Sequence, residues 1–480
     1  MADLETGDIQ GMIVTGYGHL ANSAYLFLRV DDPARAKEWL ARIVPSVTSA
    51  KWDTGPGGRV ERPEWALNVA FTAQGLAALG VGEAALETFP DEFRAGMAEP
   101  GRARLLGDVG GSAPEHWEIG GPDQADDLHV LLIVQANGRE VLAARVREQR
   151  ALFGPGGVRE SAPLQEGYLP ADGREHFGFR DSISQPEMEG SPRRSPTAED
   201  CVKAGEFVLG YPNEYGNLPP TPTVPAAADA HGNLPPLRSD VASPDVRDLG
   251  RNGSYLVFRK LEQDVAGFRR YFEESFSPEE RGLMAAKFVG RWPNGAPLAL
   301  APEHEDPRYA EPPQNNDFGY ATTDPHGFRC PVGAHIRRVN PRDALGADPA
   351  KSLESVNRHR ILRRGALYGG QSGEGDTEGG RRGVLFFCVN ADIERQFEFV
   401  QHTWINNPRF GGNYNDRDPL LGANGDPGLA DDGPPPGMTI PGEPARRRVV
   451  GLPRFVAVRG GGYFFMPGIS ALRFLAGTPR

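Results

Sequence analysis

The stretch Ala24-Tyr25-Leu26-Phe27-Leu28-Arg29-Val30 begins the pattern that decides the fold. Its aromatic and aliphatic residues are typical of a β-strand. The next stretch, from Asp32 to Leu40, begins with a residue that caps helices and places Pro33 at the first helical position, where the fixed φ of proline suits a helix. The sequence therefore predicts a strand followed directly by a helix.

The same order of strand and helix recurs in the second half of the chain. Tyr255-Leu256-Val257-Phe258-Arg259 predicts a strand, and residues 262–272 predict the helix after it. The other strand and helix pairs are 128–134 with 139–152 and 384–389 with 392–404. Chance similarity is one explanation and an internal duplication is the other. Duplication predicts an α+β fold in which each half is an antiparallel sheet with helices.

Two segments rich in proline, glycine, asparagine and aspartate interrupt this pattern. One runs from about residue 186 to 250 and the other from 416 to 444. Loops of this length are often functional, so each segment either rims a cavity or is an inert surface excursion. We therefore expect an N-terminal half over 1–205, a linker on the surface over 206–250, and a C-terminal half over 251–480.

The composition restricts the class of partner. The 480 residues carry a formal net charge of −12, which disfavours binding to nucleic acid or to an anionic membrane. No apolar run has the length that spans a bilayer, and the acidic N-terminus has no signal-peptide pattern. The three cysteines are too few and too scattered for a disulfide framework or a zinc cluster. We expect a cytoplasmic protein that binds neither nucleic acid nor membranes.

One histidine has an unusual setting. Phe328-Arg329-Cys330-Pro331-Val332-Gly333-Ala334-His335-Ile336-Arg337-Arg338-Val339-Asn340-Pro341-Arg342 surrounds His335 with four arginines, in a segment that resembles extended chain. Such arginines can pair with the propionate carboxylates of a haem. A histidine between alanine and isoleucine is more often a packed core residue, so this segment alone leaves both interpretations open.

Two further segments carry candidate chemistry. Phe177-Gly178-Phe179-Arg180-Asp181-Ser182-Ile183-Ser184-Gln185-Pro186 places a carboxylate after a glycine and an aromatic residue. Arg360-Ile361-Leu362-Arg363-Arg364-Gly365-Ala366-Leu367-Tyr368-Gly369 places adjacent arginines in an apolar strand. Neighbouring residues of a strand point to opposite faces, so Arg363 and Arg364 should separate. A buried arginine requires an anionic partner or a ligand.

With these segments, the chain resembles the dye-decolorizing peroxidases, a family of haem enzymes. Further motifs of the resemblance are Asp8-Ile9-Gln10-Gly11, Asp392-Ile393-Glu394-Arg395-Gln396-Phe397, Trp404-Ile405-Asn406-Asn407-Pro408 and Gly460-Gly461-Gly462-Tyr463-Phe464-Phe465-Met466-Pro467. The resemblance covers nearly the whole chain and is to the larger class of the family. It implies two ferredoxin-like halves in one chain, arranged like a dimeric α+β barrel, with one haem b held mainly by the C-terminal half.

The resemblance also implies roles for individual residues. His335 is the expected iron ligand, Asp181 the distal acid and Arg363 the distal arginine, while Arg364 points away. Such a site uses hydrogen peroxide to oxidise phenols and bulky aromatic dyes by one-electron steps through a ferryl intermediate. The alternative is a haem-binding carrier or sensor with weak peroxidase activity, and neither reading fixes the oligomeric state.

Supporting roles follow in the same way. Asp418, or Asp416 as its rival, is expected to accept the second ring N–H of the iron ligand. Arg342 is the expected propionate contact.

Two residues on the expected peroxide-binding side of the haem, Phe386 and Ser182, leave questions open. Phe386, on the strand with Val384, either lines the distal pocket or packs in the core. Ser182 stands where the family usually has glycine. Either a positive φ there costs energy or displaces Asp181, or the hydroxyl hydrogen-bonds the carboxylate or a distal water.

Overall fold

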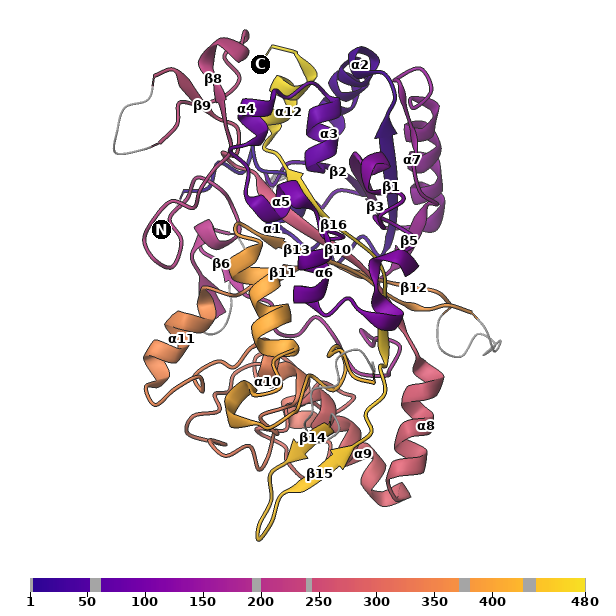
Figure 1. Cartoon of the computed structure of the whole chain (residues 1–480), viewed down its shortest axis with the longest axis vertical. Helices are drawn as coiled ribbons and strands as arrows, with labels where there is room; N and C mark the ends of the chain where they lie inside the picture. Colours follow the sequence, from indigo (N-terminus) through magenta and orange to yellow (C-terminus); the bar gives the residue numbers. More distant parts are fainter. Residues whose placement is uncertain are drawn as a thin grey trace.

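The computed structural model describes residues 3–51, 62–191, 200–238, 244–370, 380–425 and 437–479. Its central feature is a ten-stranded antiparallel sheet drawn from both halves of the chain (Figure 1). The first half contributes β1 (Asn22–Val30), β2 (Trp65–Phe71), β3 (Val130–Ala136), β4 (Val158–Glu160) and β5 (Gln165–Tyr168). The second half contributes β10 (Ser254–Gln263), β11 (Leu362–Arg363), β12 (Ala366–Tyr368), β13 (Gly383–Asn390) and β16 (Val456–Met466).

The sheet closes on itself. Its strands follow the order β10-β16-β2-β3-β1-β5-β12-β13, and β13 pairs again with β10. The two halves meet at two short seams, Phe465 with Phe71 between β16 and β2, and Leu367 with Tyr168 between β12 and β5. Closure removes the unpaired edges that an open sheet would expose. This barrel of two similar halves confirms the expected α+β fold class and the duplication.

Aromatic rings fill the inside of the barrel. Tyr25 stacks on Phe387 with ring centroids 4.6 Å apart, and Phe387 stacks on Phe258 at 4.9 Å. Phe27 completes this group at 5.1 Å from Phe258, and all four side chains are fully buried. They come from strands of both halves, so burial of these rings fastens the halves together.

Helices cover part of the outside of the barrel and also build a second region beside it. They are α1 (Gly11–Val14), α2 (Pro33–Ile43), α3 (Ala73–Ala78), α4 (Glu83–Leu86), α5 (Asp91–Ala95), α6 (Pro100–Leu106), α7 (Arg139–Ala151), α8 (Val265–Ser275), α9 (Pro278–Val289), α10 (His335–Val339), α11 (Pro349–Asn357) and α12 (Ile469–Ala476). Asp32 caps α2 as expected, because its carboxylate accepts from the N–H groups of Ala34 and Arg35. The helix expected over 392–404 consists of two π-helical turns, η9 (Glu394–Glu398) and η10 (Val400–Ile405).

The segment between the halves does not lie wholly on the surface, and that expectation was wrong for its first part. Phe207, Val208 and Leu209 have no exposed surface and pack in the core. The rest includes the hairpin of β8 (Thr223–Pro225) and β9 (Val246–Asp248), and two shorter strands, β6 (Glu187–Met188) and β7 (Cys201–Val202), lie just before it. The boundaries 1–205, 206–250 and 251–480 stay a prediction.

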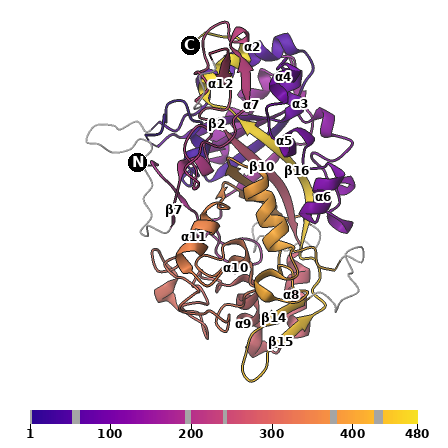
Figure 2. The same ribbon diagram turned by 60° about the vertical axis from the view of Figure 1, so that its left-hand side comes forward.

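A second region extends from the barrel. Figures 1 and 2 agree that α8, α9 and α10 gather at the end of the molecule opposite α2 and α12, together with β14 (Gly437–Ile440) and β15 (Arg447–Val450). This region is built from the C-terminal half and packs on the outer face of its sheet. No helix within the described ranges is long and apolar enough to cross a membrane.

We predict that Phe387→Ala lowers the free energy of unfolding of the cofactor-free protein by about 3–5 kcal/mol, because a fully buried ring is lost between two stacked neighbours. Urea denaturation measures the change. The control is Val450→Ala, since that side chain is 53% exposed. Equal effects of the two substitutions would contradict this description of the core.

Candidate active site

A cavity of about 280 Å³ lies between the C-terminal part of the sheet and the second region. Leu261, Val384, Phe386, Val456 and Val458 form its wall on the sheet side. The opposite wall includes His335, Ile336, Val339, Leu420 and Leu421. Phe386 lines the cavity and also packs against the hydrophobic core, so both placements that the sequence offered are present.

His335 is the first residue of α10, so the extended conformation expected for this segment was wrong. The ring Nδ1 lies 2.9 Å from Oδ2 of Asp418, which is completely buried. Donation of the Nδ1 proton to this carboxylate leaves the lone pair on Nε2, the tautomer that binds a metal. The side chain lines the cavity and is thus placed to hold a metal ion there.

Asp418, and not Asp416, is the partner of this histidine. Its second oxygen accepts from the N–H groups of Leu420 and Leu421 at 2.9 and 2.8 Å, which fixes the carboxylate in place. Asp416 instead accepts from the Thr439 N–H at 2.8 Å and pairs with Arg448.

Electrostatics reinforces the contact between His335 and Asp418. Burial alone would lower the pKa of His335, but the Asp418 charge raises it above the ordinary value. Burial alone would also raise the pKa of Asp418, and the His335 charge lowers it. The two shifts agree that the pair is a favourable one.

Asp181 and Arg363 meet across the cavity from His335. Oδ1 of Asp181 lies 2.7 Å from Nη1 of Arg363, and both side chains line the cavity. The 45% of the Asp181 side chain that is accessible faces the cavity. Burial alone would raise the pKa of Asp181, but the Arg363 charge and a hydrogen bond from the Ser182 N–H hold it below its ordinary value. The acid is therefore held as a carboxylate.

The neighbouring arginine turns the other way, as the strand alternation predicts. The Arg364 guanidinium donates to the carbonyl oxygens of Met12 and Ile13 at 2.7 and 3.1 Å. Gln185 aligns Arg363, because its Oε1 accepts from the Arg363 N–H at 3.1 Å. The sequence did not single out Gln185, although it lies in the Asp181 segment.

Ser182 has a φ of 62°, in the left-handed region where a side chain costs energy. The cost that the departure from glycine implied is thus present. The N–H of this strained residue also contributes to the lowered pKa of Asp181. The strain therefore occurs in the residue directly after the acid.

Arginines collect at one end of the cavity. Arg291, Arg342 and Arg360 line it together with Arg363. Burial, with the charge of Arg342, lowers the pKa of Arg291 to about 9, and burial lowers that of Arg360 to about 10 despite Asp200. This mutual repulsion would be relieved by a bound anion, as two propionates would supply.

Arg342 was the expected propionate contact, and the structure places it in this group. Its guanidinium also donates to the carbonyl oxygens of Asn316 and Phe318 at 2.9 and 3.0 Å, which fixes its orientation. Arg291 was missed, because a single arginine after a helix carries no signal of its own in the sequence. Asn340, which also lines the cavity, was missed for the same reason.

The other arginines around His335 hold the chain in place and do not line the cavity. Arg337 is buried against Asp324 and the Cys330 carbonyl, at 3.1 and 2.8 Å. Arg338 is fully buried and donates to the Trp404 carbonyl at 2.6 Å. Arg329 donates to the Ala299 carbonyl at 3.0 Å. Backbone carbonyls and Asp324 use the donors of these three arginines, which leaves Arg342 as the arginine of this segment that lines the cavity.

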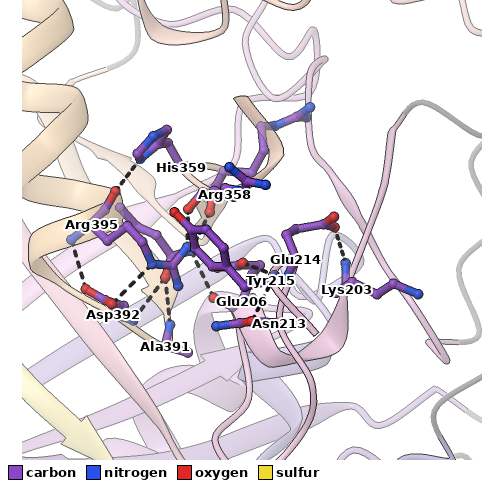
Figure 3. Close-up of polar contacts among 12 residues, drawn as sticks. Lys203, Glu206, Asn213, Glu214, Tyr215, Arg358, His359, Ala391, Asp392 and Arg395 are labelled. Carbon is purple, nitrogen blue, oxygen red and sulfur yellow. Dashed lines mark hydrogen bonds and ion pairs between the residues drawn. The ribbon is translucent and has the colours of Figure 1, made fainter. Parts of the chain in front are cut away.

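His359 lines the cavity, and a hydrogen bond on the side away from the cavity fixes its ring. Its Nδ1 donates to the Arg395 carbonyl at 2.5 Å (Figure 3). Arg395 in turn extends between Glu206 at 2.7 Å and Asp392 at 3.2 Å. This network joins the motif that begins at Asp392 to the cavity wall.

These observations fit a haem. The cavity has apolar walls for a flat ring, a histidine with a free Nε2 on one side, an acid and an arginine on the other, and a cationic end. In the ranges that the structure describes, no group of three or more metal-binding side chains forms a separate metal site. Of the two histidines that line the cavity, His359 is tied to the Arg395 carbonyl, and His335 can offer one nitrogen, which suits iron that is already held by a porphyrin.

Comparison with known proteins agrees with this site. Residues 8–159 match the family described as the DyP dimeric alpha+beta barrel domain. A dye-decolorizing peroxidase of Exidia glandulosa is 30% identical over 98% of this chain and 87% of its own length. A multifunctional dye peroxidase of Amycolatopsis sp. is 31% identical over 85% of this chain and 82% of its own length.

A solved structure supports the same assignment. The crystal structure of a fungal DyP-type peroxidase from Auricularia auricula-judae superposes with a TM-score of 0.77 at 28% identity, covering 99% of this chain and 100% of that one. The fold and site define a haem peroxidase of the α+β barrel type. The chain belongs to the dye-decolorizing peroxidase family.

We predict that Ser182→Gly raises the free energy of unfolding by about 1 kcal/mol, because glycine adopts a positive φ without strain. Urea denaturation of the cofactor-free protein measures the effect. Ser184→Gly is the matched control: Ser184 has no positive φ, so glycine there should destabilise. If both substitutions destabilise the protein, Ser182 is not strained.

Proposed function

We propose that this protein uses hydrogen peroxide to oxidise phenolic compounds and bulky aromatic dyes, with one haem b per chain held by His335. The observation that carries the proposal is the cavity with His335 and Asp418 on one side and Asp181 and Arg363 on the other. Membership of the dye-decolorizing peroxidase family supports the same reaction. One solved relative is described as a complex with 2,6-dimethoxyphenol, which supports a phenolic reductant.

When bound, haem supplies an iron with an open position for peroxide and a ring that accepts oxidising equivalents. Asp181 takes a proton from the inner peroxide oxygen and returns it to the outer one. This role requires the ionised carboxylate that Arg363 and the Ser182 N–H maintain. Arg363 also stabilises the negative charge that develops on the departing oxygen.

On the opposite side, Asp418 makes His335 a stronger electron donor by accepting its Nδ1 proton in a hydrogen bond. Arg342, with Arg291 and Arg360, would hold the propionates. Phe386 and the neighbouring apolar side chains exclude water from the reacting face.

We also propose that the protein resides in the cytoplasm. Its three cysteines, Cys201, Cys330 and Cys388, are free thiols, which suits a reducing compartment. Fractionation of cells that express the protein would test this proposal.

We predict that His335→Ala abolishes stable haem incorporation, because it removes the only proposed iron ligand. The ratio of Soret to protein absorbance after reconstitution measures the loss. His304→Ala is the control, since that histidine is exposed and is not part of the cavity lining. Unchanged haem content in His335→Ala would refute the ligand assignment.

The haem-loaded wild type provides the test of function. Hydrogen peroxide should shift the Soret band rapidly, and a phenol or dye should restore it. A band that only bleaches slowly would favour a carrier or sensor and contradict the peroxidase proposal.

We predict that Arg363→Leu slows the peroxide-induced Soret change by about 10²-fold, because the developing negative charge loses its guanidinium partner. The wild-type rate should persist below the ordinary pKa of an aspartate, since the pKa of Asp181 is lowered and the carboxylate stays ionised there. Removal of Arg363 raises the pKa of Asp181, so the acid limb of the profile should move to higher pH. Stopped-flow rates between about pH 3 and pH 7 measure both effects.

Arg308→Leu is the control for charge removal, because that side chain is 78% exposed and lies outside the cavity lining. It should leave both the rate and the pH profile unchanged. An acid limb that stays in place in Arg363→Leu would show that Asp181 is not the titrating acid.

A further inference from the structure

Tyr463 has a hydrogen bond that sets it apart from the other tyrosines. It lies on β16 within the closing glycine-rich motif and is 2% exposed. Its hydroxyl donates to Oε1 of Glu398 at 2.7 Å, and Glu398 is equally buried. The second oxygen of Glu398 lies 2.7 Å from Nη1 of Arg102, on α6 of the N-terminal half.

All twelve tyrosines of the chain lie in the described ranges, and Tyr463 is the one whose hydroxyl donates to a carboxylate. The buried Tyr211 hydroxyl donates to the amide oxygen of Asn252 instead. Tyr255 is fully buried and its hydroxyl has no hydrogen-bond partner in the described chain. The hydrogen bond from a buried tyrosine hydroxyl to a carboxylate therefore distinguishes Tyr463 from the other tyrosines of this chain.

Aromatic rings connect Tyr463 to the cavity. Its ring centroid is 6.3 Å from that of Phe397, which lines the cavity and lies 6.4 Å from Phe386. The strand pairing also places Tyr463 near the cavity. Tyr463 pairs with Val257, and Arg259, two residues further along β10 on the same face, lines the cavity. Tyr463 thus lies just behind the cavity wall, out of reach of bulky substrates.

The carboxylate decides whether such a tyrosine can be oxidised. A phenol that loses an electron becomes a strong acid, and a buried charged radical without a base is costly. At Tyr463 the proton can move from Oη to Oε1 of Glu398 along the existing hydrogen bond. One electron leaves the ring, one proton crosses to Glu398, and the products are a neutral tyrosyl radical and a neutral carboxylic acid beside Arg102. The step reverses when an electron returns.

We propose that Tyr463 is an internal one-electron donor to the peroxide-oxidised cofactor, with Glu398 as its proton acceptor. The inference rests on the peroxidase function proposed above, which supplies the oxidant. Tyr463 stores one oxidising equivalent inside the protein when no reducing substrate is present. Its burial keeps the radical away from solvent and from coupling with a second molecule.

The test is electron paramagnetic resonance of haem-loaded protein, frozen shortly after one equivalent of hydrogen peroxide is added without a reducing substrate. The wild type should give a tyrosyl signal, which ring-deuterated tyrosine should narrow. Tyr463→Phe should abolish the signal by removing the hydroxyl at nearly constant shape. Glu398→Gln should also abolish it, because an amide can accept the hydrogen bond but cannot take up the proton.

Two control variants complete the test. Tyr255→Phe removes a buried hydroxyl that has no acceptor, and Tyr215→Phe removes a tyrosine that is 52% exposed between Arg358 and Arg395 (Figure 3). Both should retain the wild-type signal. A signal that persists in Tyr463→Phe, or one that disappears in Tyr215→Phe, would overturn the inference.

The outcomes also separate this inference from the peroxidase proposal. If peroxide does not shift the Soret band of the wild type, the peroxidase function itself fails. If the band shifts but the wild type gives no tyrosyl signal, the role of Tyr463 fails and the peroxidase function stands. Should Tyr463→Phe not fold or bind haem, Glu398→Gln decides with the same readout.

Discussion

The pairing of β10 with both β13 and β16 is the constraint on which the rest of the structure depends. It makes one continuous sheet. Because side chains alternate along each strand, one face of the sheet forms the barrel interior and the other forms the cavity wall. Phe258 and Phe387 point into the barrel and stack there, whereas their neighbours Arg259 and Phe386 point outward into the cavity. One set of strands therefore supplies both the core that joins the halves and the wall of the site. A register shift of one residue would exchange the two sets and destroy both.

The charged side chains of the site are also arranged in a definite pattern around the cavity. The cationic end holds Arg291, Arg342 and Arg360 in a largely buried place, where their repulsion is costly without an anion. Asp181 and Asp418 each lie against a cationic or proton-donating partner on opposite sides of the cavity. The protein thus carries the electrostatic complement of a dianionic ring with a metal at its centre.

The sequence predicted the fold well, since strands and helices follow from local patterns, and it singled out side chains that the folded chain brings to one cavity. The strand beginning near Ala24 and its repeat near Tyr255 are visible because period and composition act over a few residues. Contacts between residues that are far apart in the sequence could not be predicted as well. The sequence could not choose between Asp416 and Asp418, because the choice depends on which carboxylate a folded loop turns toward His335.

The arginines also show that contacts in the folded chain could not be predicted from positions in the sequence. Arg337 and Arg338 sit beside His335 in sequence, yet a helix turns them toward Asp324 and toward backbone carbonyls. Arg291 lies far away in sequence and reaches the cavity. Proximity along the chain predicts proximity in space only when the local conformation is known, and here the expected extended conformation was wrong.

Ser182 shows why a strained residue can persist at such a site. Its positive φ costs energy, while its N–H helps to keep the pKa of Asp181 below the ordinary value. Glycine would adopt the same conformation with less strain in the folded state and more freedom in the unfolded chain. The side chain of Ser182 is exposed and is not part of the cavity lining, so the hydroxyl that replaces the usual glycine lies outside the cavity in which Asp181 acts. The structure therefore separates two effects that the sequence had merged: the backbone of residue 182 carries the strain and its N–H favours the ionised acid, whereas its side chain stays outside the cavity.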